Sequence, residues 1–415
     1  MVKVIADLHV HSRFARACSN DITLKGMAAM AKLKGISILS TGDFTNPFWI
    51  NEIKKELESA GNGLYKLKGS NGDVQFAIGG EICTSSYNGK KQVRIHHCVL
   101  MSSIEKAEQF NASIEKYGNL AADGRATLEM DPAELVEKAL AADSDAFIFP
   151  AHVWTPWYGA LGAMSGFNSI KEVYKDMEKN IYALETGLSS DPPMNWRLSE
   201  LDKYSLISNS DMHSIQKMGR EANLFDLPET SYKAMIDAIK EKKEKGFSMT
   251  FEYYPEEGKY HYDGHRECGY SVNPSSKETI CPVCGRKLVA GVLHRIEELA
   301  DRPEGYVPRG SVPYMHLIPL IELISKVSRK SEYSEQVRQL YSKLLGIDSE
   351  FNLLVHTSIE KISEVSKEAA DAISKVRSNK VHVVPGYDGV FGKIELEEKS
   401  EESNKDIKKH QALLF

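Results

Sequence analysis

Several features that would point to a membrane or secreted protein are missing from these 415 residues. No stretch approaches the roughly 20 apolar residues of a transmembrane helix, and the amino terminus lacks the basic-then-apolar pattern of a signal peptide. Basic residues are not in excess, because 52 lysines and arginines face 58 aspartates and glutamates. A local basic channel or a bound cation can still face phosphate on an acidic protein. We therefore expect a cytoplasmic protein and exclude no ligand from charge alone.

Cysteine is also scarce, with six in the whole chain. The three scattered ones are Cys18, Cys83 and Cys98. The others form His265-x2-Cys268 and, after a twelve-residue gap, Cys281-x2-Cys284. Two ligand pairs across a loop are typical of a structural zinc site and not of a disulfide framework. His261 is the alternative to His265 as the fourth ligand.

Short apolar runs alternate with helical stretches through the first 250 residues. The runs with strand character are residues 4–8, 36–40, 74–78, 93–100, 146–149, 181–184 and 205–208. The stretches with helical composition between them include residues 23–34, 48–60, 103–117 and 132–141. Alternation of this kind favours an α/β fold with a parallel sheet and right-handed crossovers.

Polar side chains follow these strands at the end where barrel and open α/β enzymes keep their chemistry. They are His9, His11, Asp43, Glu81, His152, Asp211 and His213. Histidine with carboxylate suits zinc, manganese or iron, whereas magnesium would use mostly oxygen. The set exceeds what one ion needs, so we expect two to three divalent ions (Zn, Mn or Mg) sharing Glu81. Such a cluster suits phosphodiester hydrolysis, although a metal amidohydrolase would use a similar set.

The motif series resembles that of the PHP (polymerase and histidinol phosphatase) superfamily. The matching motifs are His9-x-His11, Asp43, Glu81, a strand histidine, Pro150-Ala151-His152 and Asp211-x-His213. The resemblance implies a distorted (β/α)7 barrel with a trinuclear metal centre, and His97 as the strand histidine with His96 as the alternative. The family often has Asp-His where this chain has Asp43-Phe44, so one ligand is missing or supplied elsewhere.

Longer sequence segments resemble those of endonuclease Q, a family of DNA-repair enzymes. They are residues 41–45, 150–157, 185–191, 194–198, 208–213 and 219–223. The resemblance implies a nick 5′ to deaminated bases (uracil, hypoxanthine, xanthine) and abasic sites, a zinc-bound insertion, and Asp211, His213 and Glu81 as catalytic residues. A histidinol-phosphatase-like phosphoesterase and a non-catalytic zinc DNA-binding scaffold are the alternatives. A histidinol phosphatase would not account for the cysteine region. A non-catalytic scaffold would have no need of the nearly complete set of metal ligands.

An enzyme that selects such bases is expected to flip the nucleotide out of the duplex. Ser189 and Ser190 are candidates to read the base edge, and the aromatic side chains nearby are candidates to stack. The expected lesion-pocket and DNA-binding residues are Ser189, Ser190, Asn195, Trp154, Trp196, Arg197 and Arg220. Packing of the aromatic loops against the barrel is an equal alternative for any one of them.

Composition divides the chain into four parts. They are a metal-dependent nuclease domain (1–252), a zinc-binding module (253–300), a helical C-terminal domain (301–394) and a charged tail (395–415). The last five residues, Gln411 to Phe415, resemble a clipped version of the peptide that docks on the sliding clamp PCNA. DNA and PCNA are thus the expected partners, with no membrane.

Overall fold

The first strand, β1 (Val2–Asp7), lies inside an 11-stranded sheet in the computed structural model, which describes residues 1–396. It runs parallel to β2 (Ile38–Ser40) and antiparallel to β11 (Ala222–Leu227). Val4 and Ala6 have no exposed surface, because the strand packs on both faces, and this accounts for its apolar run. The strand therefore holds the chain firmly just before His9 and His11.

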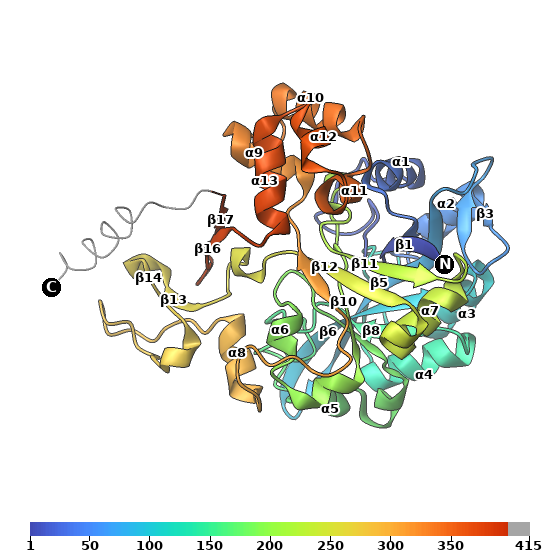
Figure 1. The fold of residues 1–415 in the computed structure, drawn as a ribbon. Coiled ribbons are helices and arrows are strands. Elements are labelled where there is room, and N and C mark those ends of the chain that lie inside the picture. Colours follow the sequence, from blue (N-terminus) through green and yellow to red (C-terminus); the bar gives the residue numbers. More distant parts are fainter. Residues whose placement is uncertain (397–415) are drawn as a thin grey trace.

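All seven strands expected from the sequence are present (Figure 1). Besides β1 and β2 they are β5 (Gln75–Asn88), β6 (Lys91–Met101), β8 (Phe147–Pro150), β9 (Ala183–Glu185) and β10 (Ser205–Ile207). Two pairs of neighbouring strands share no ladder and are linked by single hydrogen bonds. The bond from Val153 N to Glu185 O, at 2.9 Å, links β8 to β9, and the bond from Ser208 N to Asn223 Oδ1, at 3.0 Å, links β10 to β11. These links close a distorted barrel, which confirms the expected α/β fold class.

The expectation of a purely parallel sheet is wrong at β6. This strand pairs antiparallel with both β5 and β8. Only Gly89, at φ 60°, and Lys90 separate the paired residues Asn88 and Lys91. A two-residue connection can only make a hairpin, since a parallel crossover needs a dozen residues or more. The register of this hairpin, with His96 opposite Cys83 and His97 opposite Ile82, determines which of the two adjacent histidines lies on the face of Glu81.

Other strands extend the sheet. They are β3 (Leu57–Ser59), β4 (Tyr65–Leu67), β7 (Thr127–Leu128), β12 (Phe247–Glu252) and β15 (Tyr314–His316). β12 pairs antiparallel with β11, and β15 runs parallel to β12. Residues 314–316, inside the predicted helical domain, thus form a strand, and the predicted helix over 48–60 stops at Glu56 and continues as β3.

The helices of the barrel begin at polar caps. Thr23 accepts a hydrogen bond from Gly26 N at the start of α1, and Asp131 accepts one from Ala133 N at the start of α4, which satisfies amide groups that a helix start leaves free. The α-helices are α1 (Leu24–Lys34), α2 (Pro47–Glu56), α3 (Ile104–Ile114), α4 (Pro132–Ala142), α5 (Ile170–Tyr174), α6 (Pro192–Asn195) and α7 (Tyr232–Glu241). The 3₁₀ helices are η1 (Glu115–Tyr117), η2 (Lys175–Asn180), η3 (Ser199–Lys203), η4 (Ile215–Lys217) and η5 (Lys242–Lys245). Within residues 1–396 no helix combines the length and apolar character needed to cross a membrane.

A small cysteine-containing unit projects beside the barrel (Figure 1). Its elements are η6 (Pro255–Glu257), β13 (Asp263–His265), η7 (Arg266–Cys268), β14 (Tyr270–Val272), η8 (Pro274–Ser276) and α8 (Val292–Leu299). β13 and β14 form an antiparallel pair of three residues each. Such a short hairpin is marginal by itself, so this unit needs the ligand set described below to hold its shape.

The C-terminal helices form a separate layer against the barrel (Figure 1). The elements are α9 (Leu320–Ser328), α10 (Glu335–Leu345), α11 (Glu350–Val355), α12 (Ile359–Ser363), α13 (Lys367–Arg377), β16 (His382–Val384) and β17 (Lys393–Glu395). Two contacts dock the layer: Lys34 Nζ lies 3.3 Å from Glu350 Oε2, and the rings of Phe251 and Phe351 pack 4.9 Å apart. The predicted clamp peptide, residues 411–415, lies outside the described residues.

Two buried carboxyl groups at the β11–β12 edge predict a pH-dependent stability. Burial raises the pKa of Glu252 from 4.5 to about 7 and holds that of Glu221 well above its usual range. Folded protein thus binds a proton at Glu252 that the unfolded chain releases, so stability falls as pH rises from about 4.5 to about 7. Glu252→Gln is expected to raise the free energy of unfolding at pH 8 by up to about 3 kcal/mol, with little change near pH 4.5.

Urea titration of both proteins at pH 4.5 and pH 8 checks this expectation. The same difference at the two pH values would contradict it, because packing alone has no such dependence. Glu257→Gln is the matched control, since Glu257 lies on the adjacent η6.

Candidate metal centre

The first two histidines leave β1 with a carboxylate behind each ring. His9 Nδ1 donates to Glu185 Oε2 at 2.9 Å, and His11 Nδ1 donates to Asp43 Oδ1 at 3.0 Å. A carboxylate on Nδ1 selects the tautomer and turns Nε2 toward the opposite side. The Nε2 of His9 is buried and has no hydrogen-bond partner among the described residues. It is therefore an available donor atom for a cation.

Glu81 occupies the centre of the cluster and is fully buried. Its Oε1 lies 2.7 Å from His96 Nδ1 and 3.1 Å from His152 Nε2, while its Oε2 lies 3.3 Å from His11 Nε2. Burial opposes ionisation of this carboxyl, but the surrounding imidazoles, His96 foremost, hold its pKa well below the usual range. Glu81 is thus a charged group shared by two sets of rings.

Asp211 completes the first set from the loop after β10. Its Oδ1 lies 3.0 Å from His11 Nε2 and 3.5 Å from His9 Nε2. His213 lies at the edge, where its Nδ1 donates to the Asp211 main-chain oxygen at 2.9 Å and its ring centre is 4.7 Å from that of His11. The nearby His rings hold the pKa of Asp211 below its usual range despite burial.

Three site residues adopt left-handed backbone angles that non-glycine residues rarely take. The φ angles are 46° at Asp43, 30° at His152 and 45° at Asp211. Each costs about 1–3 kcal/mol and persists only where the surroundings enforce it. Hydrogen bonds hold the main chain of two of these residues in place: Asp211 N donates to His9 O at 2.9 Å, and His152 N donates to Glu185 Oε2 at 2.7 Å. The strain lies at the strand ends that carry the cluster.

His97, the expected strand histidine, lies outside the cluster, and its alternative His96 lies inside. Successive side chains of a strand point to opposite faces, and in the inverted strand β6 the inward one is His96. His97 instead bonds the Tyr174 hydroxyl at 2.7 Å and the Thr84 hydroxyl at 2.8 Å. The inward His96 ring is stacked under Tyr158, with ring centres 4.4 Å apart.

The ligand atoms fall into two groups that share Glu81. One group is His9, His11, Glu81 and Asp211, and the other is Glu81, His96 and His152; within each, the candidate atoms lie within 4.8 Å of one another. Asp43 and His213, expected as ligands, flank these groups. Nitrogen and carboxylate donors with an unpartnered buried imidazole suit a divalent transition ion, so the residues fit bound divalent metal.

Two residues of the site were not assigned from the sequence. Glu185 is the last residue of β9, so placement at a strand end would have found it, whereas Glu81 lies within β5 and not at its end. Arg125 Nη1 donates to Glu81 Oε2 at 2.9 Å, but it comes from an irregular loop that gives no periodic signal.

Three of the expected lesion-pocket residues form a buried hydrogen-bonded chain. Trp154 Nε1 donates to Asn195 Oδ1 at 2.8 Å, Asn195 Nδ2 donates to Ser190 Oγ at 3.1 Å, and Ser190 Oγ donates to Thr186 O at 3.0 Å. All three side chains are buried. They hold the loop after β9 and leave Ser189, which is half-buried, as the accessible serine.

The other expected DNA-binding residues are spread over two faces. Trp196 packs edge-on against Tyr314, with ring centres 5.7 Å apart, and Arg197 pairs with Glu297. Arg220 lies closer to the cluster, because its Nε donates to Ser210 O at 2.8 Å and its Nη2 to Asp211 O at 3.3 Å.

A cavity of about 410 Å³ separates the barrel from the helical layer. Arg220 lies in its wall, so the cavity adjoins the cluster through the Asp211 main chain. Its lining includes Leu188, Lys217, Arg220, Tyr253, Glu322 and Lys326. Cations and carboxylates alternate there, for instance Lys217 Nζ at 2.7 Å from Glu322 Oε1, which suits a polar occupant.

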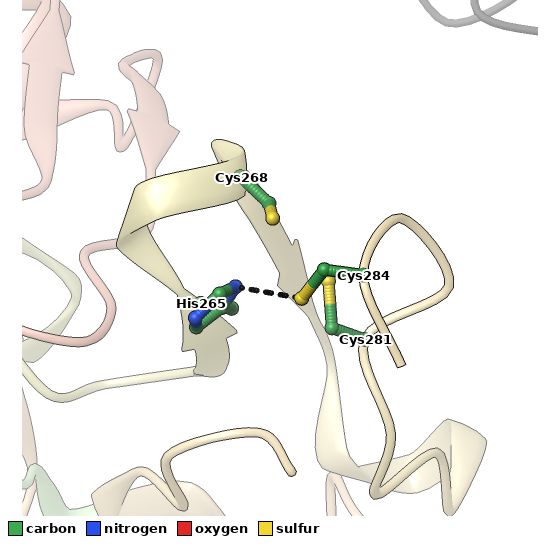
Figure 2. A group of neighbouring side chains, drawn as sticks. All are labelled: His265, Cys268, Cys281 and Cys284. Carbon is green, nitrogen blue, oxygen red and sulfur yellow. Dashed lines mark hydrogen bonds between the residues drawn. The ribbon is translucent and has the colours of Figure 1, made fainter. Parts of the chain in front are cut away.

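The second ligand set is the predicted zinc quartet. Figure 2 shows His265, Cys268, Cys281 and Cys284 directed toward one another, with all four candidate atoms within 4.8 Å. The His265 Nδ1 and Cys284 Sγ atoms are 3.5 Å apart. The alternative, His261, is not in the group and stacks on Tyr262 at 5.4 Å. Four such donors fit a closed structural zinc site with no position for substrate.

A distorted α/β barrel with a buried histidine–carboxylate cluster that fits divalent metal is the arrangement of a metal-dependent hydrolase. The lesion-specific endonuclease PfuEndoQ from Pyrococcus furiosus is 31% identical, and its crystal structure matches with a TM-score of 0.85 over 97% of this chain and 99% of that one. Endonuclease Q in complex with a 27-mer duplex substrate with an abasic lesion at the active site is 31% identical, with a TM-score of 0.83 over 96% and 98%. The chain belongs to the endonuclease Q family.

Two further similarities concern parts of the chain. A family model described as the MJ0043 C-terminal domain matches residues 319–380. The uncharacterized protein MJ0043 of Methanocaldococcus jannaschii is 30% identical over 252 residues, which are 58% of this chain and 31% of that protein. This chain therefore spans about a third of that relative's length.

Proposed function

We propose that this protein is a DNA-repair endonuclease that hydrolyses the phosphodiester 5′ to deaminated bases and abasic sites. The observation that carries the proposal is the pair of histidine–carboxylate groups sharing Glu81, in a chain 31% identical to a lesion-specific endonuclease over nearly its whole length. A histidinol-phosphatase-like activity would need neither the cysteine unit nor the helical layer.

The proposed cofactors are two to three divalent ions and one structural zinc. His9, His11, Glu81 and Asp211 would hold one ion, and Glu81, His96 and His152 a second. Asp43 and His213 are the candidate ligands of a third. Divalent cations at such positions offset the charge of a phosphate, polarise a water and stabilise the leaving oxygen.

The chain's own residues orient the reaction. Glu185 and Asp43 hold the His9 and His11 rings from behind, so the donor atoms need no rearrangement when substrate arrives. The Nδ1 of His213 is engaged with the Asp211 main chain, and about a third of its side chain is exposed. Its Nε2 is therefore the free atom of this ring, and it is the atom that would hold the third ion.

We place the damaged nucleotide in the cavity of about 410 Å³. Reading a base requires it to leave the duplex, and this cavity offers hydrogen-bonding groups and the aromatic ring of Tyr253, with Ser189 next in the chain to the lining residue Leu188. Arg220 connects it to the loop of Asp211, so an occupant is held beside the cluster.

Activity on defined duplexes tests the proposal. The substrates carry one uracil, hypoxanthine, xanthine or abasic site, with an undamaged duplex as the control, and Mn²⁺, Mg²⁺ or Zn²⁺ is added to metal-depleted protein. A nick 5′ to the lesion is expected. Release of phosphate from small monoesters without nicking would favour the phosphoesterase alternative, and DNA binding without any product would favour the scaffold.

Adjacent serines give a matched pair of variants. Ser189→Ala is expected to narrow the rate ratio between uracil and cytosine duplexes about 5-fold, the worth of one hydrogen bond, with unchanged stability. Ser190→Ala is expected to lower the free energy of unfolding by about 1–3 kcal/mol, because it leaves buried partners unpaired. Single-turnover rates and urea titration measure the two effects. A Ser189→Ala enzyme that discriminates as its parent does would exclude Ser189 from base reading.

We also propose that residues 411–415 dock on the PCNA clamp. Deleting them is expected to abolish retention of the protein on immobilised PCNA while leaving cleavage of short duplexes unchanged. Equal retention of both forms would remove the clamp from the partners of this protein.

A further inference from the structure

The loop of residues 123–126 is built to present one arginine to the cluster. Asp123 Oδ1 accepts from Arg125 N at 3.2 Å and from Arg16 N at 3.1 Å. Gly124 N donates to Phe14 O at 2.9 Å, and a Cβ at Gly124 would lie 2.5 Å from Asp43 Oδ2. Only glycine permits this approach, so the loop is held against the segment that follows the first two histidines.

The guanidinium of Arg125 spans the border between the buried cluster and solvent. Its Nη1 donates to Glu81 Oε2 at 2.9 Å, and 25% of the side chain is exposed while that of Glu81 is not exposed at all. Two other arginines of the barrel have other partners: Arg13 binds Glu52, and Arg220 binds the main chain of residues 210 and 211. Within the described chain, Arg125 is thus the side-chain cation that faces the cluster carboxylates.

Glu81 has close side-chain partners besides this arginine. His96, His152, His11 and His9 already lie within 3.7 Å of its oxygens. Once Glu81 serves as a shared ligand, its Oε2 has less charge to offer a guanidinium, which carries five N–H donors in a planar fork. That fork matches the geometry of a phosphate, and it lies at the exposed side of the cluster.

We infer that Arg125 binds the non-bridging oxygens of the phosphate that is cleaved. This inference rests on the proposed function. During hydrolysis one P–O bond forms to a water oxygen as another breaks, and negative charge grows on the non-bridging oxygens. A guanidinium fixed beside them stabilises that charge more than the ground state. Arg125 is therefore a catalytic residue as well as a counter-ion of Glu81.

The test compares a charged with a neutral phosphate at the cleaved position. A duplex with an abasic-site analogue carries there either the natural phosphodiester or a methylphosphonate of each configuration. Binding is measured by fluorescence anisotropy with Ca²⁺, and single-turnover cleavage with Mn²⁺. The proteins are the wild type, Arg125→Gln, Arg125→Lys and the control Arg338→Gln, which alters an exposed residue of α10.

Arg125→Gln is expected to cleave the natural duplex about 10²–10³-fold more slowly, with Arg125→Lys in between. The wild type is expected to lose about 10-fold in affinity for one methylphosphonate, whereas Arg125→Gln should bind both duplexes within about 2-fold. Calorimetric titration of metal-depleted protein with Mn²⁺ should give Arg125→Gln an affinity equal to or above that of the wild type. Arg338→Gln should match the wild type throughout.

Two results would overturn the inference alone: equal discrimination between the duplexes by wild type and Arg125→Gln, or a loss of Mn²⁺ affinity that accounts for the slower cleavage. Either would make Arg125 only a support for Glu81. Failure of the wild type to cut any lesion duplex would overturn the proposed function, and this inference with it.

Discussion

Glu81→Gln is expected to lower the endonuclease rate about 10³-fold or more, the largest effect on activity of any single change here. The amide is nearly isosteric but has no charge to join the two ligand groups, and its NH₂ would face the imidazole nitrogens that the carboxylate now accepts from. Single-turnover cleavage of an abasic-site duplex measures the loss, and circular dichroism shows whether the fold is intact.

Glu→Gln variants at two other positions serve as comparisons for this rate loss. Glu185→Gln removes the charge behind His9 without touching the shared position, so metal affinity is expected to fall about 10–100-fold and excess metal should restore much of the rate. Glu108→Gln alters an exposed pair with Lys54 and should leave the rate unchanged. If Glu81→Gln lost no more than Glu185→Gln, the shared role of Glu81 would be wrong.

Lys34→Ala is expected to lower the free energy of unfolding by about 3–5 kcal/mol, the largest effect on stability. Lys34 and Glu350 are 2% and 4% exposed, so truncation leaves a carboxylate buried between the barrel and the helical layer. Glu350 would keep its hydrogen bonds from Leu320 N at 3.0 Å and the Tyr341 hydroxyl at 2.6 Å, but no cation. Urea unfolding at neutral pH measures the loss.

Lys32→Ala is the matched control, two residues away on the same helix. Lys32 pairs with Asp73 at the surface, where both side chains are more than half exposed, and such pairs contribute about 0–1 kcal/mol. Similar losses for Lys32→Ala and Lys34→Ala would mean that the buried pair does not dock the helical layer.

The sequence predicted the site better than the sheet. Placement of polar residues after apolar runs singled out Glu81, His152 and Asp211, which the structure brings together, although Glu81 lies within β5 and not at its end. The direction of β6 could not be read in the same way, since an antiparallel strand has the same apolar composition as a parallel one. The motif resemblance favours His97, whereas the register of β6 against β5 places His96 beside Glu81.

Roles that depend on contacts distant in sequence were harder to predict. Asn195 and Trp154 have the composition of a base pocket, but their hydrogen bond across 41 positions makes them parts of the loop's support. Arg125 has no neighbouring motif, and its role becomes visible only when the loop is seen against Glu81. The zinc quartet was the easiest set to predict, because the local spacing of its residues in the sequence was enough to identify all four.

The left-handed φ angles at Asp43, His152 and Asp211 also predict how this enzyme would lose activity under selection for stability. Glycine adopts such angles freely, so exchanging any of the three for glycine would relieve backbone tension while discarding a group that the reaction requires. A laboratory screen that rewarded heat resistance alone would accumulate these exchanges. Its most robust survivors would be barrels that no longer cut DNA.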